Sequence, residues 1–197
     1  MGIRKYIFRK ISNFLFRSEP FIPERLVTFN NLVQTNSAWI GLEKIIPSIL
    51  EKFSIKNGSC IEFGVENGYS TGIFAQLFEK VTGVDTFQGD VHAGIKDSLQ
   101  TAQKNLMPFN NIKLIKNSYQ EFIKSNDTKY DLCHVDIIHT YKDTFKCGEW
   151  AVQHCHCVIF HDTESFAMVR KAVYDLGKKY NKKFYNYPLH NGLGILI

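Results

Sequence analysis

Several features are missing from this 197-residue sequence, and each absence excludes a class of protein. No apolar stretch approaches the roughly 20 residues that a membrane-spanning helix needs. Charges interrupt the first twenty residues too often for the apolar core of a secretory signal, so we expect a cytoplasmic protein. Internal repeats and low-complexity tracts are absent as well, which leaves an ordinary globular chain.

Cysteine is scarce and poorly spaced for a disulfide scaffold. The five cysteines are odd in number, and most fall in or beside strand-like apolar runs, so we expect reduced thiols. The run His154-Cys155-His156-Cys157 has the composition of a metal motif. Neighbouring residues on a strand point to opposite faces, and no second Cys/His pair has zinc-finger spacing, so we predict no zinc site there.

Positive charge is concentrated in the N-terminal 17 residues. Lys and Arg number 24 against 19 Asp and Glu, which gives a formal net charge of +5. Five basic residues and no acid lie between Arg4 and Arg17, so the remainder of the chain is neutral. The lysines near residue 180 lack the interleaved aromatic residues of a nucleic-acid groove, and we expect no nucleic-acid partner.

Residues 1–17 form an amphipathic segment. Five apolar residues recur there at helical spacing, with basic residues between them: Ile3, Ile7, Ile11, Phe14 and Leu15. This helix would pack on its own domain or on a partner chain, for example in a homodimer, or would lie on a membrane surface as a peripheral anchor. We expect residues 18–36 to form a connector and residues 37–197 to form the domain.

From residue 59 onward, short apolar runs alternate with helix-like segments. Runs over 59–64, 80–85, 111–116, 130–136 and 157–161 are typical of strands buried on both faces of a parallel sheet. Helices are expected over 37–53, where Pro47 either kinks the helix or starts a second piece, and over 69–78, 94–106, 119–125, 141–153 and 166–180. Residues 183–187 and 192–197 are expected to form an antiparallel hairpin. The pattern predicts a doubly wound, Rossmann-like α/β fold.

Polar residues at the carboxyl ends of these strands are the candidate site residues, because open α/β sheets bind ligands there. After the first run, Glu62 is followed by Gly64 and Gly68, and then Ser70 and Thr71 begin a helix. Glycines let the backbone approach a ligand, and a helix start offers unpaired N–H groups. A plain strand-to-helix turn would explain the glycines but not an acid inside an apolar strand.

Asp85 ends the second strand, 23 residues after Glu62. An acid at this distance commonly accepts hydrogen bonds from ribose hydroxyls, although a lone strand-terminal Asp can also be an ordinary cap. The glycine turn upstream favours the ribose interpretation.

A second group of polar residues follows two later strands. Asp136 and His139 follow the fourth strand, and His161 and Asp162 follow the fifth. Carboxylates with one or two imidazoles suit Mg²⁺ or another divalent ion. Helix caps are the alternative, but the convergence of four polar groups favours a metal or catalytic cluster.

These residues in order resemble a known family. The series Glu62-x-Gly64-x-x-x-Gly68-x-Ser70-Thr71, followed by Asp85, resembles motifs I and II of class I S-adenosylmethionine-dependent methyltransferases. Residues 135–163, and the ending 191–194, resemble the branch that contains macrocin-type sugar O-methyltransferases and relatives of cephalosporin hydroxylase. The resemblance covers roughly residues 37–197. It implies the strand order 3-2-1-4-5-7-6, counted from the strand over 59–64.

The resemblance also implies a cofactor and a reaction. S-adenosylmethionine would donate a methyl group to a small-molecule hydroxyl, in this branch that of a sugar or glycan precursor. Gly64 and Gly68 would bracket the methionine part of the cofactor, with Glu62, Ser70 and Thr71 in the same loop. Asp85 would hold the ribose, and Ser118 would lie near the adenine.

On the acceptor side, the resemblance implies that Asp136 and Asp162, with His161 beside them, coordinate Mg²⁺ and thereby lower the pKa of the acceptor hydroxyl. The family's usual general base is replaced by Ile138, which cannot take a proton, so we expect His139 or His161 to act as the base. The acceptor pocket is expected from residues 88–96, which include His92, and from 165–168 and 18–40.

Two other hypotheses stay open at this point. A module with this fold that has lost or altered its chemistry would account for Ile138. A dinucleotide-binding oxidoreductase is weakened by the glycine spacing, because Gly64 and Gly68 do not form the G-x-G-x-x-G fingerprint.

Overall fold

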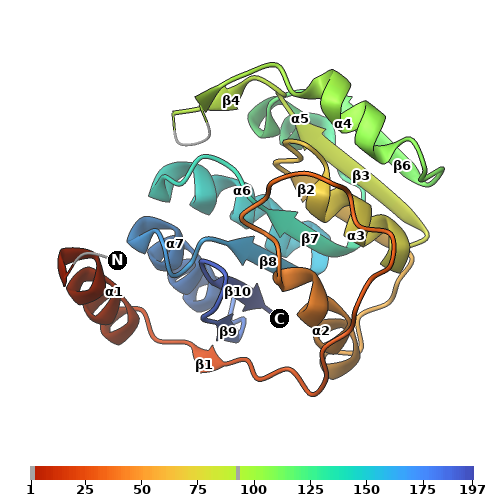
Figure 1. Cartoon of the computed structure of the whole chain (residues 1–197). Helices are drawn as coiled ribbons and strands as arrows, with labels where there is room; N and C mark the ends of the chain where they lie inside the picture. The colour runs from red at the N-terminus through yellow and green to blue at the C-terminus, as the bar shows by residue number, and fades with distance from the viewer. Residues whose placement is uncertain (1–2, 92–93) are drawn as a thin grey trace.

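One mixed sheet of eight strands, in the order β1-β9-β10-β8-β7-β2-β3-β6, forms the centre of the molecule (Figure 1). The computed structural model describes residues 3–91 and 94–197. The parallel part consists of β6 (Ile112–Lys116), β3 (Lys80–Asp85), β2 (Ser59–Phe63), β7 (Tyr130–Val135) and β8 (Cys155–His161). β10 (Leu193–Leu196) pairs antiparallel with β8 and with β9 (Phe184–Tyr187), so the predicted hairpin is confirmed.

The seven predicted strands have the predicted neighbours, but the sheet has an eighth strand, at one edge, that was not predicted. β1 (Glu19–Pro20) pairs in parallel with β9, within the segment that we expected to be only a connector. A two-residue strand carries no hydrophobic period, and therefore no sequence pattern could have predicted it.

A separate hairpin of β4 (Gly89–Asp90) and β5 (Gly94–Ile95) also differs from the prediction. The helix expected over residues 94–106 begins only at Leu99, as α4 (Leu99–Leu106). Gly94 has a φ of 80°, in the left-handed region, which excludes it from an α-helix.

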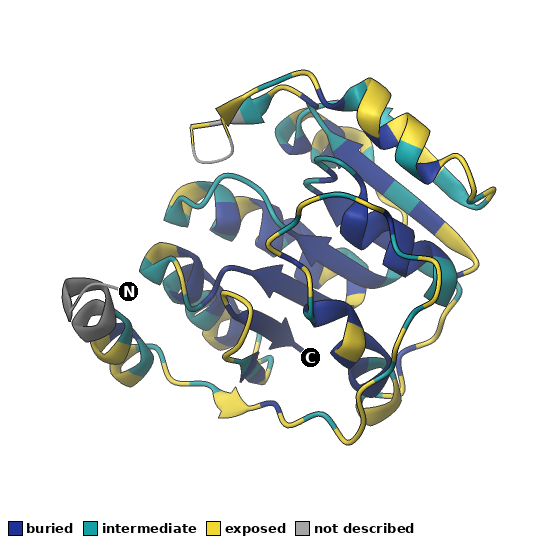
Figure 2. Cartoon of the chain, in the orientation of Figure 1, coloured by how far each residue is buried: buried dark blue, intermediate teal, exposed yellow. Residues whose placement is uncertain are grey.

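Helices cover both faces of the sheet. One face carries the 3₁₀ helix η1 (Leu42–Ile45), α2 (Ile46–Lys52), α3 (Tyr69–Leu77) and α4, and the other carries α5 (Tyr119–Ser125), α6 (Tyr141–His154) and α7 (Ala167–Lys179). Strand side chains alternate between two cores: Cys60 and Leu132 belong to one, and Ile61 and Cys133 to the other. Beyond their first one or two residues, the central strands β2 and β7 are accordingly buried (Figure 2), and the doubly wound prediction is confirmed.

Pro47 divides the helix that was expected over residues 37–53. It lies in the first turn of α2, directly after η1. Proline lacks a backbone N–H but is tolerated in a first helical turn, so the second of the two predicted outcomes is the observed one.

The cysteines and the run His154-Cys155-His156-Cys157 are described by the structure. All five cysteines are free and buried. On β8, Cys155 and Cys157 point inward whereas His156 between them is exposed, so these side chains do not converge. Within the described residues, no cluster suited to a metal involves this segment.

α1 (Ile3–Leu15) lies at the periphery beside α7 (Figure 1). Its described side chains begin at Arg9. None of the helices in the described ranges has the length and apolar character needed to cross a bilayer.

The order of the strands reverses between β2 and β7, so the carboxyl ends of these two strands lie side by side. The backbone N–H of Asp136, just after β7, donates to the carbonyl of Phe63 at the end of β2 at 2.8 Å. Ligands of open α/β sheets bind at such a reversal point. The fold therefore places both predicted groups of polar residues at one location.

Candidate active site

A cleft of about 990 Å³ opens at the carboxyl ends of β2, β3, β7 and β8. Seven of the predicted site residues line it: Gly64, Asp85, Ser118, Asp136, His139, His161 and Asp162. The three segments expected to form the acceptor pocket also contribute, through Gly89 and Lys96, Ser165 and Phe166, and Asn36 to Ala38 with Ile40. His92 lies outside the described residues.

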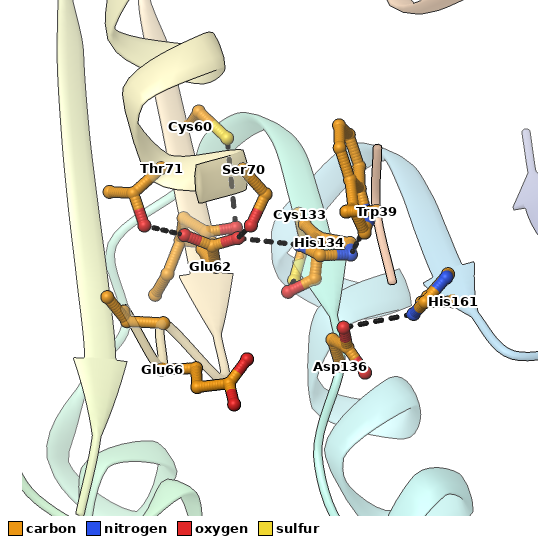
Figure 3. A network of polar contacts seen from close by, with 12 residues as sticks. Trp39, Cys60, Glu62, Glu66, Ser70, Thr71, Cys133, His134, Asp136 and His161 are labelled. Atoms are coloured by element: carbon orange, nitrogen blue, oxygen red, sulfur yellow. Dashed lines mark hydrogen bonds and ion pairs between the residues drawn. The ribbon is translucent and has the colours of Figure 1, made fainter. Parts of the chain in front are cut away.

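Glu62 is the centre of a buried hydrogen-bond network behind the cleft (Figure 3). The hydroxyls of Ser70 and Thr71, at the start of α3, donate to its two carboxyl oxygens. His134 on the neighbouring strand lies with Nδ1 2.8 Å from the same group, and the indole N–H of Trp39 donates to His134 Nε2 at 3.1 Å. An indole can only donate, so His134 Nε2 accepts and Nδ1 carries the hydrogen that bonds Glu62.

This network explains the acid inside an apolar strand. Glu62 and Thr71 have no exposed surface, so they hold the glycine turn in place and do not contact a ligand directly. Ser70 is buried too and lines only a small adjoining cavity of about 20 Å³. Gly68 packs against α4, since a Cβ there would lie 2.8 Å from Leu106 Cγ. These four residues support the site from behind.

Gly64 is required by close packing at the strand reversal. Its φ is 94°, and a Cβ added to it would lie 1.7 Å from the carbonyl oxygen of Asp136. Only glycine lets the turn after β2 lie against the end of β7. This contact joins the two halves of the cleft.

Asp85 fastens the same turn from the other side. Its Oδ2 accepts hydrogen bonds from the backbone N–H groups of Val65 and Glu66, each at 2.8 Å, and Oδ1 accepts from Phe87 N–H at 2.7 Å. The capping alternative is therefore present in the structure. Because the carboxylate also lines the cleft, its contact with a ribose stays a prediction.

Ser118 caps α5, where its hydroxyl accepts a hydrogen bond from Glu121 N–H at 3.2 Å. It lies in the cleft wall with Asn117 and Tyr119. Ser118 therefore lies in the cleft after β6, and its place near an adenine ring stays a prediction.

Sequence reasoning missed several residues of this region. Glu66, with a φ of 52°, lines the cleft and pairs with Lys96 across it. His134 lies opposite Glu62 in the β2–β7 register, and a second polar residue in a buried strand was the signal that could have found it. Trp39 carried no such signal, because its partner is 95 positions away in the sequence.

On the other side of the cleft, two carboxylates and two imidazoles face one another. Nε2 of His139 lies 2.8 Å from Asp162 Oδ2 and 3.7 Å from Asp136 Oδ1. Nδ1 of His161 lies 3.1 Å from Asp136 Oδ2 and 3.5 Å from Asp162 Oδ2. The predicted cluster is therefore brought together by the fold.

The charges of this cluster shift its pKa values. Burial alone would lower the pKa of His139, but its hydrogen bonds to Asp136 and Asp162 raise the pKa to about 9. Burial likewise opposes charge on His161, and the carboxylate of Asp136 raises its pKa above the usual value. Burial would raise the pKa of Asp136, and the two imidazoles lower it instead.

Three of these residues could hold a metal ion. One ligand atom from each of Asp136, His161 and Asp162 lies within 4.8 Å of the other two. Nε2 of His161 lies 3.3 Å from the carbonyl oxygen of His190, which can only accept, so Nε2 carries a hydrogen. The negative charge of the two carboxylates is then balanced either by a proton on Nδ1 of His161 or by a cation that this atom helps to bind.

Two neighbours complete this half of the site. The ring of His139 stacks on Phe166, with centroids 4.1 Å apart and planes 8° from parallel. Ile138 lies in the cleft wall at the position where the resemblance places a base. The stacking fixes the imidazole of His139 next to the cluster.

Comparison with known proteins identifies the domain. A family profile described as a methyltransferase domain matches residues 61–163, from the middle of β2 to just past the end of β8. No curated protein sequence matches the chain.

Solved structures with the same fold span the whole chain or most of it. A Staphylococcus aureus protein assigned as a caffeoyl-CoA O-methyltransferase superposes with a TM-score of 0.62 at 16% identity, over 100% of this chain and 92% of that one. An O-methyltransferase from Bacillus cereus, in complex with SAH, has a TM-score of 0.57 at 10% identity, over 100% and 91%. A Streptococcus mutans protein assigned as a methyltransferase, also with SAH, has a TM-score of 0.55 at 16% identity, over 75% and 96%.

The superpositions establish a shared fold. The profile match extends over more than half of the sequence and includes Gly64, Asp85, Asp136 and Asp162. The chain therefore belongs to the methyltransferase-domain family.

Proposed function

We propose that this methyltransferase is an S-adenosylmethionine-dependent O-methyltransferase. Its acceptor would be a small-molecule hydroxyl, most specifically that of a sugar or glycan precursor, as in the macrocin-type branch, with a divalent cation assisting. The observation that carries the proposal is the single cleft that joins the Gly64–Asp85 turn to the cluster of Asp136, His161 and Asp162.

The cofactor half is built to hold S-adenosylmethionine, which when bound supplies an electrophilic methyl group. Asp85 fixes the loop after β2 through the N–H groups of Val65 and Glu66, and Gly64 allows that loop to line the cleft. Ser118 lies in the wall of the same cleft. The structures from Bacillus cereus and Streptococcus mutans that share this fold hold SAH, which supports the same ligand class here.

The metal half fits a divalent cation on the chemistry of its donors. Asp136, Asp162 and the Nδ1 atom of His161 would coordinate it, with His161 oriented by the His190 carbonyl. A cation there would act as a Lewis acid toward the acceptor hydroxyl. From the protein side, the imidazoles of His139 and His161 face these carboxylates.

His139 is the residue that we propose as general base. Ile138 cannot accept a proton, and Nδ1 of His161 faces Asp136 and Asp162, where the proposed cation would bind. His139 lines the cleft, is held by stacking on Phe166, and contacts Asp162. With a cation bound to Asp136 and Asp162, His139 would lose the hydrogen bonds that raise its pKa to about 9, and the neutral imidazole could then take the proton of the acceptor hydroxyl.

The rest of the lining supports a polyol acceptor. The cleft wall includes five uncharged side chains that can form hydrogen bonds: Asn36, Ser37, Gln120, Ser165 and Asn191. Amide and hydroxyl groups can donate and accept, as the hydroxyls of a sugar require. Phe166 adds an aromatic surface beside them.

Calorimetry with S-adenosylhomocysteine on the full chain tests the cofactor, with EDTA or MgCl₂ in the buffer. Methyl transfer to a panel of sugars and nucleotide sugars, followed by mass spectrometry, tests the reaction. We expect micromolar binding, turnover that EDTA abolishes, and a turnover number about 100-fold lower in His139→Gln. His156→Gln, an exposed histidine on β8, is the matched control and keeps full turnover.

The outcomes separate the parts of the proposal. Absence of S-adenosylhomocysteine binding would refute the cofactor, and turnover unaffected by EDTA would refute the metal. Full turnover in His139→Gln would remove its role as base. Binding without turnover on any acceptor would favour the module with lost chemistry, for which Ile138 is the specific observation.

A further inference from the structure

α1 packs on the domain with a polar face. The guanidinium Nε of Arg9 and the amide of Asn13 both donate to the carboxylate of Glu164. Ser12, on the same side of the helix, is buried. Residues 9, 12, 13 and 16 lie on one face of an α-helix, and this face points inward.

The side chain of Glu164 is itself buried and accepts hydrogen bonds from two further side chains. Arg170 donates to it at 2.9 Å and Asn186 at 2.8 Å. Arg170 also donates from Nε to the carbonyl of Phe16, at the end of α1, at 2.9 Å. These directional contacts fix the rotation of α1 about its axis, so its opposite face cannot turn inward.

That opposite face is apolar and exposed. Ile11, Phe14 and Leu15 have 51%, 66% and 54% of their surface exposed, and their spacing puts them on one side of the helix. The usual arrangement for a helix on a globular domain is the reverse, with apolar residues inward. The exposed side of this end of α1 is visible in Figure 2.

Positive charge flanks the apolar face. Lys10 and Arg17 are exposed, and the guanidinium of Arg17 lies 5.0 Å from the ring centroid of Phe14. The first 17 residues hold five basic residues and no acid. Two copies of this face would bring like charges together, whereas an anionic surface would neutralise them.

We propose that the face formed by Ile11, Phe14 and Leu15, with Lys10 and Arg17 beside it, docks on an anionic lipid bilayer. α1 would lie in the plane of the interface, with its apolar side chains among the acyl chains and its cations at the headgroups. The hydrogen bonds of Arg9 and Asn13 to Glu164 would hold the domain in one orientation on that surface. The inference does not depend on the proposed reaction.

Flotation of the full chain with extruded vesicles tests this docking. We expect binding to vesicles of phosphatidylcholine with phosphatidylglycerol, little binding to phosphatidylcholine alone, and loss of binding in high salt. The double variant Phe14→Glu/Leu15→Glu should bind at least about tenfold more weakly, and Arg17→Gln about fivefold more weakly. Leu26→Glu, which replaces an equally exposed leucine outside α1, should bind like the parent.

Circular dichroism and the melting temperature of each variant confirm that these exposed substitutions leave the fold intact. No binding to anionic vesicles, or equal binding by the Phe14→Glu/Leu15→Glu variant, would overturn the proposal. Light scattering on lipid-free protein supplies the other decisive result: a dimer that Phe14→Glu dissociates would assign this face to a second copy instead.

Discussion

The two halves of the cleft satisfy their acidic groups in different ways. At the ends of β2 and β3, Asp85 accepts three backbone N–H groups and Glu62 accepts three side-chain donors. At the ends of β7 and β8, Asp136 and Asp162 instead face two imidazoles. The first half is held by hydrogen bonds that do not depend on a bound ligand, whereas the second depends on a balance of charge.

This difference indicates which half is preformed. Backbone donors keep their positions whatever the cleft contains, so the loop after β2 is ready for a ligand. The carboxylates raise the pKa of both imidazoles, and a cation can replace the imidazole protons as the partner of the carboxylates. Substitutions in the two halves should therefore separate binding from turnover.

The largest effect is expected from Asp136→Asn, which removes a carboxylate that faces both imidazoles. Turnover should fall by about a thousandfold, which corresponds to about 4 kcal/mol of transition-state stabilisation. Binding of S-adenosylhomocysteine should be unchanged, as measured by calorimetry. Asp127→Asn, at an exposed position, is the control. Parallel losses of binding and turnover would show that the two halves are not separable.

Gly64→Ala tests the contact between the halves. A Cβ 1.7 Å from the Asp136 carbonyl forces the backbone of β2 and β7 apart, and we expect a loss of about 3 kcal/mol or more in the free energy of unfolding. Gly94→Ala provides the matched control, because Gly94 also has a positive φ but nothing within 4 Å of its added Cβ. Its cost should be only about 1 kcal/mol, from backbone strain alone. Equal costs in urea denaturation would mean that the close contact contributes nothing.

Asp85→Ala should weaken the preformed half. Three backbone N–H groups lose their acceptor, so we expect about 2 kcal/mol less stability and S-adenosylhomocysteine binding about 100-fold weaker. Asp97→Ala, which removes an exposed carboxylate that accepts Leu99 N–H, is the comparison. Intact binding in the Asp85 variant would count against the ribose assignment.

The smallest effect is expected from Trp39→Phe, behind the cleft. His134 Nε2 would keep its buried position without a donor, at a cost of about 1 kcal/mol. Trp150→Phe removes the indole bond to the Asn126 carbonyl near the surface, where water can replace it, and should cost less. The order of the two melting temperatures decides whether the buried network contributes to stability.

Much of the fold was predictable because it depends on local patterns. Apolar runs of five to seven residues placed β2, β3, β6, β7 and β8, and the turn residues between them marked the helices. The failures lie where a pattern is too short or a strand pairing overrides it. β1 has two residues and no period, and residues 94–95 pair with β4, so that α4 begins only at Leu99.

The site was predictable only as a set of residues at strand ends. Glu62 was singled out correctly as an unusual acid, but its role depends on His134 and Trp39, which contact it or its partner only after folding. Likewise, no spacing rule distinguishes an Asp85 that accepts three loop N–H groups from one that is free.

By itself the sequence determined the order of strands and helices, the neutral domain with a basic amphipathic segment, and the polar residues that end each strand, since all of these follow from neighbours in the chain. Only the tertiary structure decided which carboxylates share a hydrogen bond, which nitrogen of His161 faces them, and which side of α1 points outward. The last depends on Arg9 and Glu164, 155 positions apart. Contacts of that separation depend on how the layers pack, and packing is a property of the whole chain.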